Sequence, residues 1–554
     1  MFIDYDAAGN SDRKGRYTKG NGSTDDLSLQ AGLSWNHSWG KHNVFANANW
    51  NLQNVTSKST TIVAEGFGND QMDDISQANY YYHDSHPTGS DSKTREVGFV
   101  EALNYSYAER YLLDLSLRET GSSVYGADNH WGTFWSTGVG WNIHNEPFMK
   151  SVRLIKLLKL RYSLGYIGTQ NFNPYQARAK YSYGTTYYDG HQGTTLLALP
   201  NTGLKWQKIY DNNWGVDFAL GDMLTGRVDY YIQNTSNLLS DITIPASTGF
   251  TTYKENMGEI QNKGIEFYLG FTPWRQNSSR SWITFTASAA HNKNKIKKIY
   301  DIFKKSNDDA DANFSMTFND LEQKLHRSLT ADEFNAYLLQ NNRPATRYFE
   351  GQSMTAIWGM KSLGIDPAIG KELYEDTKGN PTWDWSAAEQ QVIGDTNPKW
   401  HGTLGISGGW HGWTLSITAS YKLGGDLYNS TLVDRVENIT GFGNLDKRVY
   451  DVWTTPGQIA PYRGVNMLSS PTDTNVNITK PTSRFVQRNN ELYISNLNIG
   501  YDFFRQAWIH KMGMERLKLS FQCNELARIT SVKVERGLTY PFARTFSFSL
   551  SATF

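Results

Sequence analysis

The chain has 554 residues, and its 54 Lys and Arg residues balance its 54 Asp and Glu residues, so the formal net charge at pH 7 is zero. This balance removes any case for a nucleic-acid partner based on bulk charge. The single cysteine, Cys523, excludes a disulfide framework within the chain and any multi-cysteine metal site. Mean hydropathy is −0.56, and no run approaches the ~18 apolar residues of a membrane helix.

Alternation of apolar and polar residues starts after a polar stretch, residues 1–26, which we expect to be a loop. From Leu27 to Trp35 and from Val44 to Trp50, every second side chain is apolar, on either side of a tight turn at Gly40–Lys41. Strict period-two alternation predicts β-strands with one apolar and one polar face. A second pair of strands is expected at 94–107 and 111–121.

The same pattern returns along the rest of the chain, to the last residue. Further two-faced strands are predicted around 158–166, 227–233, 264–271, 413–421, 516–523 and 544–554. Strands of about ten residues with one apolar and one polar face are typical of transmembrane β-barrels. A barrel also explains a chain that is polar on average and rich in aromatic residues, because inward polar residues offset outward apolar ones.

The lengths of the connections distinguish this barrel from a set of soluble β-sandwiches, whose strands also alternate. Short turns are expected near residues 40, 109, 221, 411 and 508. Long links are expected at 53–93, 168–205, 237–255, 295–399 and 425–483. Short and long connections alternate, as periplasmic turns and extracellular loops do in outer-membrane barrels. The predicted fold class is therefore an all-β transmembrane antiparallel barrel.

The expected number of strands is about 15, and the first and last both run from the outside inward. An odd number does not close a bacterial barrel of antiparallel strands, and an open sheet would expose two edges to lipid. We therefore expect residues 27–554 to be the C-terminal portion of a larger barrel, with 543–554 as its closing strand.

One insert interrupts the β-pattern. Residues 319–342 are predicted to be helical, and residues Thr330 to Glu333 have the sequence of a capping box. The insert falls within the long link 295–399, which places it in an extracellular loop.

Several segments resemble the SusC/RagA family of TonB-dependent outer-membrane transporters. The most diagnostic is NMGEIQNKGIEF at 256–267. The others, in chain order, are RETGSSVYG (118–126), GTFWSTGVGWNIHNEPFM (132–149), LKLRYSLGYIGTQNFNPYQ (158–176), NTGLKWQK (201–208), GRVDYYIQNTSNLL (226–239), WGMKSLGIDPAIGKELYED (358–376), GDTNPKWHGTLG (394–405), YKLGGDLYN (421–429) and the C-terminal NELARITSVKVERGLTYPFARTFSFSLSATF.

The resemblance covers nearly all of residues 94–554 in the expected order. It implies a 22-stranded barrel with an N-terminal plug, energised through a TonB box by TonB–ExbB–ExbD and capped by a SusD-like surface lipoprotein. No plug or TonB box is matched, so plug and about seven strands are expected to be missing. Fifteen strands counted back from 22 begin at strand eight, which should descend, in agreement with the loop lengths.

Candidate substrate contacts are aromatic residues of the loops and polar residues of the barrel interior. Exposed aromatic rings stack on sugars or receive apolar peptide side chains. Packing between loops, or against the lipoprotein, is the alternative. For the charged interior residues the alternative is pairing with one another or with the plug. The loop candidates are Tyr80, Tyr81, Tyr82, Trp383 and Trp385, and the interior candidates are Arg161, Arg227, Asp229 and Glu266.

No enzyme or cofactor site is expected. His83, Asp84 and His86 lack a third firm ligand and are interpreted as a polar loop rather than a metal site. Glu375 and Asp376 have no partner histidine, and the stretch YEDTKGNPT at 374–382 has too few carboxylates for calcium.

The leading hypothesis is import of a nutrient oligomer, a glycan first and an oligopeptide second, across the outer membrane of a Gram-negative bacterium. The alternatives are a surface glycan-binding β-sandwich protein and a non-functional transporter fragment. The resemblance gives Phe554, the aromatic last residue, the role of a signal that barrel-assembly machinery reads.

Overall fold

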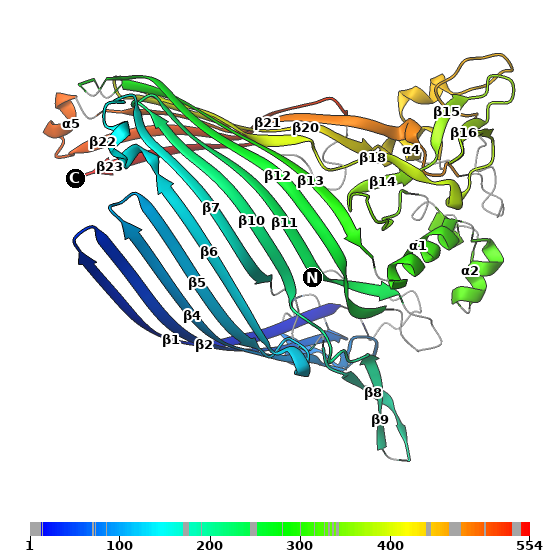
Figure 1. Cartoon of the computed structure of the whole chain (residues 1–554). Coiled ribbons are helices and arrows are strands. Elements are labelled where there is room, and N and C mark those ends of the chain that lie inside the picture. The colour runs from blue at the N-terminus through cyan, green and yellow to red at the C-terminus, as the bar shows by residue number, and fades with distance from the viewer. Residues whose placement is uncertain are drawn as a thin grey trace.

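The computed structural model shows one large curved sheet with loops and small helices at one end (Figure 1). The structure describes residues 13–554 except 14, 69–70, 72–73, 85, 170–174, 176, 190, 244–251, 277, 280, 300, 315, 326, 331–332, 335–336, 339–342, 439–444, 465–477, 504–505 and 534–543.

The main sheet has 16 described strands, all in antiparallel pairs. One of them, β3 (Tyr80–Tyr81), pairs only with β2 at the margin. The other fifteen follow one another in chain order: β1 (Arg16–Trp39), β2 (His42–Glu65), β4 (Thr88–Tyr107), β5 (Tyr111–Ser122), β6 (Trp131–Asn142), β7 (Ile155–Thr169), β10 (Gln207–Leu220), β11 (Leu224–Thr243), β12 (Thr252–Gln276), β13 (Ser281–Lys298), β19 (Trp400–Trp410), β20 (Trp413–Tyr428), β21 (Val486–Asp502), β22 (Arg516–Thr530) and β23 (Thr545–Thr553).

This arrangement confirms the predicted all-β class and the expected strand number, and it excludes a β-sandwich for the described residues. Since neighbours are antiparallel, β1 and β23 run in the same direction, as the loop lengths predicted. The connections alternate as expected: for example, β1 and β2 are joined by the turn at Gly40–Lys41, whereas residues 299–399 separate β13 from β19.

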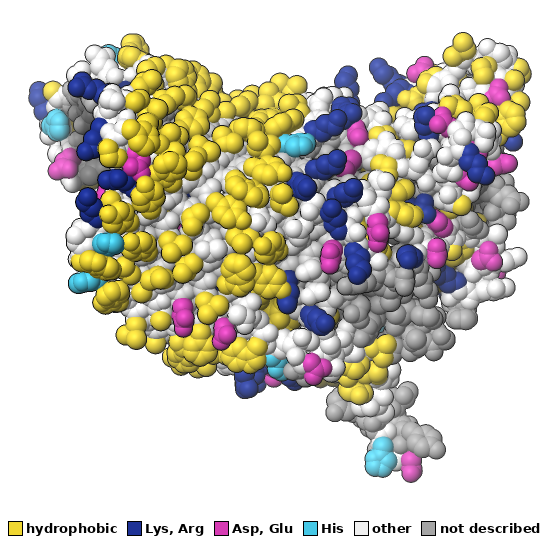
Figure 2. Space-filling view, viewed as in Figure 1, with side chains coloured by type: hydrophobic (Ala, Val, Ile, Leu, Met, Phe, Trp, Pro, Cys, Tyr) yellow, Lys and Arg dark blue, Asp and Glu magenta, His cyan; other side chains and the backbone are white. Residues whose placement is uncertain are grey.

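The two faces of the sheet differ in chemistry. Directly opposed residues of an antiparallel pair share a face, so the register links Leu33 to Ala48 and Leu117 to Trp135 on one side. We call this side the outward face. Its side chains form a broad hydrophobic band across the strands (Figure 2), with the lipid-facing pattern of an outer-membrane barrel. Among the described residues, no helix is long and apolar enough to cross a membrane.

The predicted loop at residues 1–26 is wrong from residue 16 onward, while residues 1–12 lie outside the described part. Residues 16–26 form the first half of β1 and pair in continuous register with residues 55–65 of β2. The alternation is missing there because this part of the hairpin extends beyond the hydrophobic band, where neither face has to be apolar. Hydrogen bonding between the two strands is independent of that pattern.

The long connection between β13 and β19 holds two helices, α1 (Asp301–Phe314) and α2 (Phe318–Leu325). Helical structure is thus present within the predicted segment 319–342, in two pieces: residues 327–330, which are not helical, separate α2 from the helical residues 333–334 and 337–338. The predicted capping box is present: Thr330 Oγ1 accepts from the Glu333 amide at 3.2 Å, and Glu333 Oε2 accepts from the Thr330 amide at 2.9 Å. The strands of this connection are β14 (Ala356–Gly359), β15 (Lys361–Ile365), β16 (Glu372–Glu375), β17 (Pro381–Thr382) and β18 (Gln391–Asp395).

Other connections also carry secondary structure. A separate hairpin of β8 (Lys180–Tyr188) and β9 (His191–Ala198) projects from the sheet between β7 and β10 (Figure 1). The link between β20 and β21 contains α4 (Ser430–Val436), and the turn between β21 and β22 contains α5 (Ala507–Lys511). The helices α1, α2 and α4 lie with the long connections at one end of the sheet, and α5 lies at the other (Figure 1).

Candidate substrate pathway

The face opposite the hydrophobic band, which we call the inward face, consists mainly of amide, hydroxyl and small side chains. Neighbouring strands join these groups directly: Ser288 and Thr403 hydroxyls lie 2.8 Å apart, and Asn496 Nδ2 donates to Asn524 Oδ1 at 2.8 Å. Such groups donate and accept hydrogen bonds without net charge. Other inward residues of this kind, by register, are Ser34, Asn47, Ser116, Ser136, Asn213, Ser416, Asn498 and Gln522.

Three of the four predicted interior residues form one charged network on β7, β10 and β11. Arg161 donates to both carboxylate oxygens of Asp217, from Nε at 2.7 Å and from Nη2 at 3.0 Å, and Nη2 also donates to Asp229 Oδ1 at 3.0 Å. Arg227 Nε donates to the other oxygen of Asp229 at 2.6 Å. Two arginines thus neutralise two aspartates, and the sequence alone did not point to Asp217, the fourth member.

Gly215 makes room for this network. A Cβ atom at position 215 would lie 2.5 Å from Arg161 Nη2 and 2.7 Å from Asp229 Oδ1. Those distances are shorter than any ordinary contact, so an alanine at this position would force the ends of the Arg161 and Asp229 side chains to shift.

Glu266 lies outside the network, although it is directly opposite Asp229 in the register of β11 and β12. Its side chain is exposed on the inward face. The structure therefore brings Arg161, Arg227 and Asp229 together and leaves Glu266 as an open acidic group beside them.

The three tyrosines at 80–82 lie at the end of the β1–β2 hairpin rather than in a free loop. Tyr80 and Tyr81 form β3, and both side chains are exposed. Arg13 lies over the Tyr80 ring at 4.8 Å, and Arg16 lies over the Tyr82 ring at 4.5 Å. These cation–π contacts favour the observed positions of the two rings.

The two loop tryptophans differ in environment. Trp383 is 55 % exposed, and its Nε1 donates to Asp366 Oδ2 at 3.2 Å. Trp385 packs against Phe314, with ring centroids 5.1 Å apart, and donates to the Pro481 carbonyl at 2.9 Å. Trp385 therefore packs between two long connections, which was the alternative to substrate contact for the loop aromatics. Trp383, in contrast, presents a face to solvent.

A buried ionic cluster, which the sequence did not indicate, joins the same two connections. Arg484 donates to Glu437 Oε1 at 2.5 Å and to Glu372 Oε2 at 2.7 Å, and both carboxylates are buried. Burial acts to raise the pKa of Glu437, but Arg484 and Arg463 outweigh it and hold that pKa below its usual range. The members are scattered over more than a hundred positions with no periodicity, so no sequence signal relates them.

Lys480 lies beside this cluster. Its Nζ donates to the Phe314 carbonyl at 2.9 Å and lies 5.9 Å from the centre of the Trp385 ring. Burial lowers the pKa of Lys480 to about 8. Lys480 thus joins the end of α1 to the connection between β20 and β21.

The remaining side chains with potential for chemistry lie apart from one another, and no described group of three His, Cys, Asp or Glu side chains has the arrangement of a metal site. His83 donates its backbone amide to Glu65 at 3.1 Å. Glu375 pairs with Lys361 at 2.8 Å, and Asp376 Oδ1 accepts from the Asn380 amide at 2.7 Å. Cys523 is a buried free thiol.

An antiparallel sheet with a lipid-facing apolar band and a polar inner face defines the wall of an outer-membrane β-barrel. A sequence model of the family described as TonB dependent receptor-like, beta-barrel matches residues 2–455. The chain belongs to this family, whose members are transporters of the outer membrane and not enzymes. The predicted family, location and absence of enzymatic function are confirmed.

Individual relatives agree with this assignment. The chain is 26% identical to TonB-dependent receptor P39 of Formosa agariphila over 509 residues, 89% of this chain and 48% of the relative. It is 37% identical to TonB-dependent receptor SusC of Bacteroides thetaiotaomicron over 192 residues, 32% of this chain and 18% of SusC. The solved RagAB peptide transporter shares the fold with a TM-score of 0.74 at 19% identity, over 93% of this chain and 53% of that chain. The chain therefore spans about half the length of the full-length relatives.

Proposed function

We propose that the chain forms part of the barrel wall of a TonB-dependent importer that takes up a nutrient oligomer, a glycan first and an oligopeptide second. In this proposal residues 27–554, with 16–26 added from the structure, are the barrel portion, and 543–554 is the closing strand. The predicted link 295–399 is an extracellular connection, of which residues 295–298 belong to β13. The substrate passes along the inward face.

The observation that carries this proposal is the chemistry of the inward face. Its strongest charges, on Arg161, Arg227, Asp217 and Asp229, are paired with one another. Open Glu266 stands beside this network, and most of the other inward residues named above carry amides and hydroxyls, which match the uncharged donors and acceptors of a sugar oligomer. The exposed rings of Tyr81 and Trp383 at the loop end add stacking surfaces for sugar rings.

The oligopeptide alternative also has support. RagAB, which shares the fold, is described as a peptide transporter. Side-chain amides form hydrogen bonds with a peptide backbone as well as with sugar hydroxyl groups. Open Glu266 would pair with a basic peptide side chain. Exposed tyrosines accept apolar peptide side chains too.

Two partners belong to the proposal. A SusD-like surface lipoprotein would rest on the extracellular connections and capture the oligomer. The TonB–ExbB–ExbD complex would supply energy through a plug domain and a TonB box. The relatives, twice as long as this chain, are named as TonB-dependent receptors, which supports the second partner.

Growth of a strain lacking the full-length gene tests substrate and function together. We expect the deletion to abolish growth on one class of neutral oligosaccharide as sole carbon source, and the full-length gene to restore it. Selective loss of growth on oligopeptides would establish the alternative. Unchanged uptake of both classes, measured with labelled oligomers, would contradict import by this protein. Replacing Trp383 by Ala should weaken uptake without lowering the amount of protein in the membrane.

A further inference from the structure

Two carboxylates stand on the apolar outward face. In the strand register Glu101 is opposite Ala48 of β2 and Leu117 of β5, and Glu119 is opposite Phe99. Opposed residues share a face, so both glutamates point the same way as these apolar side chains. Both are exposed, and Figure 2 shows acidic side chains interrupting the hydrophobic band.

The depth of Glu101 follows from its position along β4. The band runs from Tyr107, at the turn end, to Val97, beyond which Arg95 begins the polar part of the strand. With a rise of ~3.3 Å per residue and a tilt of about 40°, these ten positions span ~25 Å, the usual height of such a band. Glu101 then lies about 15 Å above the turn-end aromatics and ~10 Å below the opposite limit.

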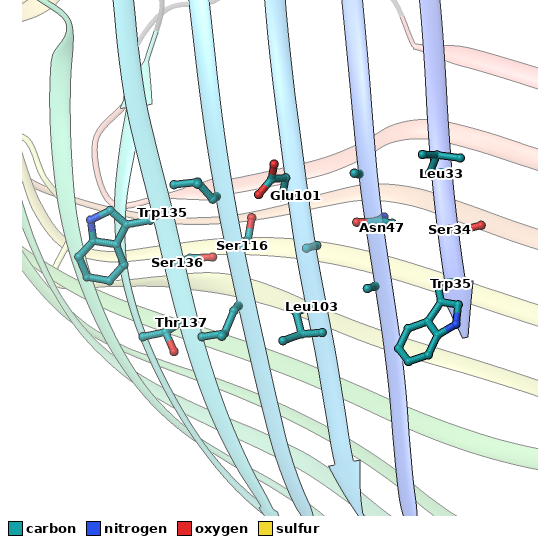
Figure 3. A pocket seen from close by; sticks show the side chains of 15 residues that line it. Leu33, Ser34, Trp35, Asn47, Glu101, Leu103, Ser116, Trp135, Ser136 and Thr137 are labelled. Atoms are coloured by element: carbon teal, nitrogen blue, oxygen red, sulfur yellow. The ribbon is translucent and has the colours of Figure 1, made fainter. Parts of the chain in front are cut away.

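A hollow surrounds Glu101. It has a volume of about 740 Å³ and is lined mainly by outward residues of five strands, β1, β2, β4, β5 and β6, together with the residues that alternate with them, such as Asn47 and Ser116. Trp35 and Trp135 stand at its opposite sides, with Glu101 between them (Figure 3). The strand β2 contributes only the small side chains of Ala46 and Ala48 on this face. The surface between the two tryptophans is therefore recessed relative to their rings. Small residues of this kind allow a neighbouring backbone to approach closely within a membrane.

No described side chain forms an ion pair or hydrogen bond with either Glu101 or Glu119 on this face. The two lie on adjacent strands as diagonal neighbours, a separation of about 7–8 Å between Cα atoms. Glu101 is an unpaired acidic group at depth in hydrocarbon, whereas Glu119, opposite Phe99, lies about 5 Å below the limit of the band at Val97. When both are ionised they also repel each other. Charged or polar groups at such depth are usually satisfied by a partner.

We propose that this hollow binds a membrane-embedded segment of another protein, and that an Arg or Lys of that segment pairs with Glu101 and Glu119. A guanidinium or ammonium group donates to two carboxylates at once, which supplies the missing charge. A lipid headgroup lies at the interface, about 10 Å above Glu101, and acyl chains offer no donor. A second copy of this chain would bring four carboxylates together.

Photo-crosslinking in the native outer membrane tests the proposal. The full-length protein carries benzoylphenylalanine in place of Leu117, in the hollow, or in place of Leu415, on the outward face of β20. Both leucines are 39% exposed, so the second position is a matched control. We expect one protein adduct from position 117 and none from 415, with the crosslinked peptide containing a basic residue within an apolar stretch.

Charge changes decide whether the carboxylates recognise the partner. Glu101→Gln with Glu119→Gln keeps shape and folding, verified by heat-modifiable gel mobility, and should lower adduct yield about tenfold or more. Lys at both positions should abolish the adduct, and a Glu in place of the partner's basic residue should restore it. Adducts to lipid alone, an adduct to this same chain, or an unchanged yield in the Gln variant would each overturn the proposal.

Discussion

Arg161 holds two aspartates of different strands on the inward face, and its removal has a predictable cost. Arg161→Met leaves Asp229, whose side chain is 10% exposed, with Arg227 alone. We expect the free energy of unfolding in lipid vesicles, measured by urea titration, to fall by about 2–3 kcal/mol, because a largely buried acid loses a partner.

Gly215→Ala and a double variant provide the controls. Alanine at 215 displaces the Arg161 guanidinium without removing a charge. The free energy of unfolding should therefore also fall in Gly215→Ala, but by less than in Arg161→Met. Arg161→Met combined with Asp229→Asn should recover part of the loss, because Arg227 then has one carboxylate, Asp217, to neutralise instead of two. Additive losses in that double variant would contradict a coupled network.

Lys480 predicts a pH dependence in the extracellular connections. Its pKa is lowered by burial from 10.5 to about 8, so between these values the unfolded connection binds a proton that the folded one does not. Docking of the connection therefore strengthens as pH rises from about 8 to 10.5, and is weakest below that window. Hydrogen exchange at the Phe485 amide should report this, and Lys480→Met should remove the dependence. Equal slopes in both proteins would refute it.

Strands were predictable wherever one of their faces meets the hydrophobic band. The turn residues 108–110 between β4 and β5 were located to the residue, since alternation on both sides ends at the last lipid-facing aromatics. The first half of β1 was missed because hydrogen bonding without an apolar face leaves no period in the sequence. The cluster around Arg484 was missed for a different reason: its members meet only through tertiary packing.

The extension of β1 gives a test at the level of one element. Amides of residues 16–26 should exchange with solvent as slowly as those of 27–39, because both halves pair in unbroken register with β2. Mass spectrometry of exchanged peptides from the full-length protein measures this. Exchange as fast as in the connection 123–130 would show that the sequence-based loop was right.

The capping box at residues 330–333 is a second test at this level. Thr330→Ala removes the hydroxyl that accepts from the Glu333 amide and should destabilise the helical turn by about 1 kcal/mol. Because Phe334 and Leu321 share a buried cluster, the change should also loosen α2. Faster exchange of the Phe334 amide would confirm it. Ser328→Ala, in the same connection and outside the cap, serves as the control.

The whole sheet has two edges, and they set the conditions for a stable barrel. Among the described strands, β1 pairs only with β2, and β23 pairs only with β22. Backbone groups without partners cannot remain in hydrocarbon, so in a membrane the hydrogen-bonding groups of both edges have to be paired. The strands of this chain therefore identify the fold class. Closure of the barrel depends on the pairing of β1 and β23 on their second edges, which the described strands do not show.

The last residue belongs to this question of closure. Phe554 follows β23 at the C-terminal edge and is 81% exposed, as are most side chains on the outward face of that strand. We expect deletion of Phe554 from the full-length protein to lower the amount of heat-modifiable barrel in the outer membrane, because assembly machinery would no longer find its aromatic end. Substrate uptake per folded molecule should stay unchanged.

Leu550→Ala, which removes a comparable apolar side chain from the same strand, should leave insertion intact. Normal membrane levels after the deletion would show that the terminal aromatic is only another lipid contact.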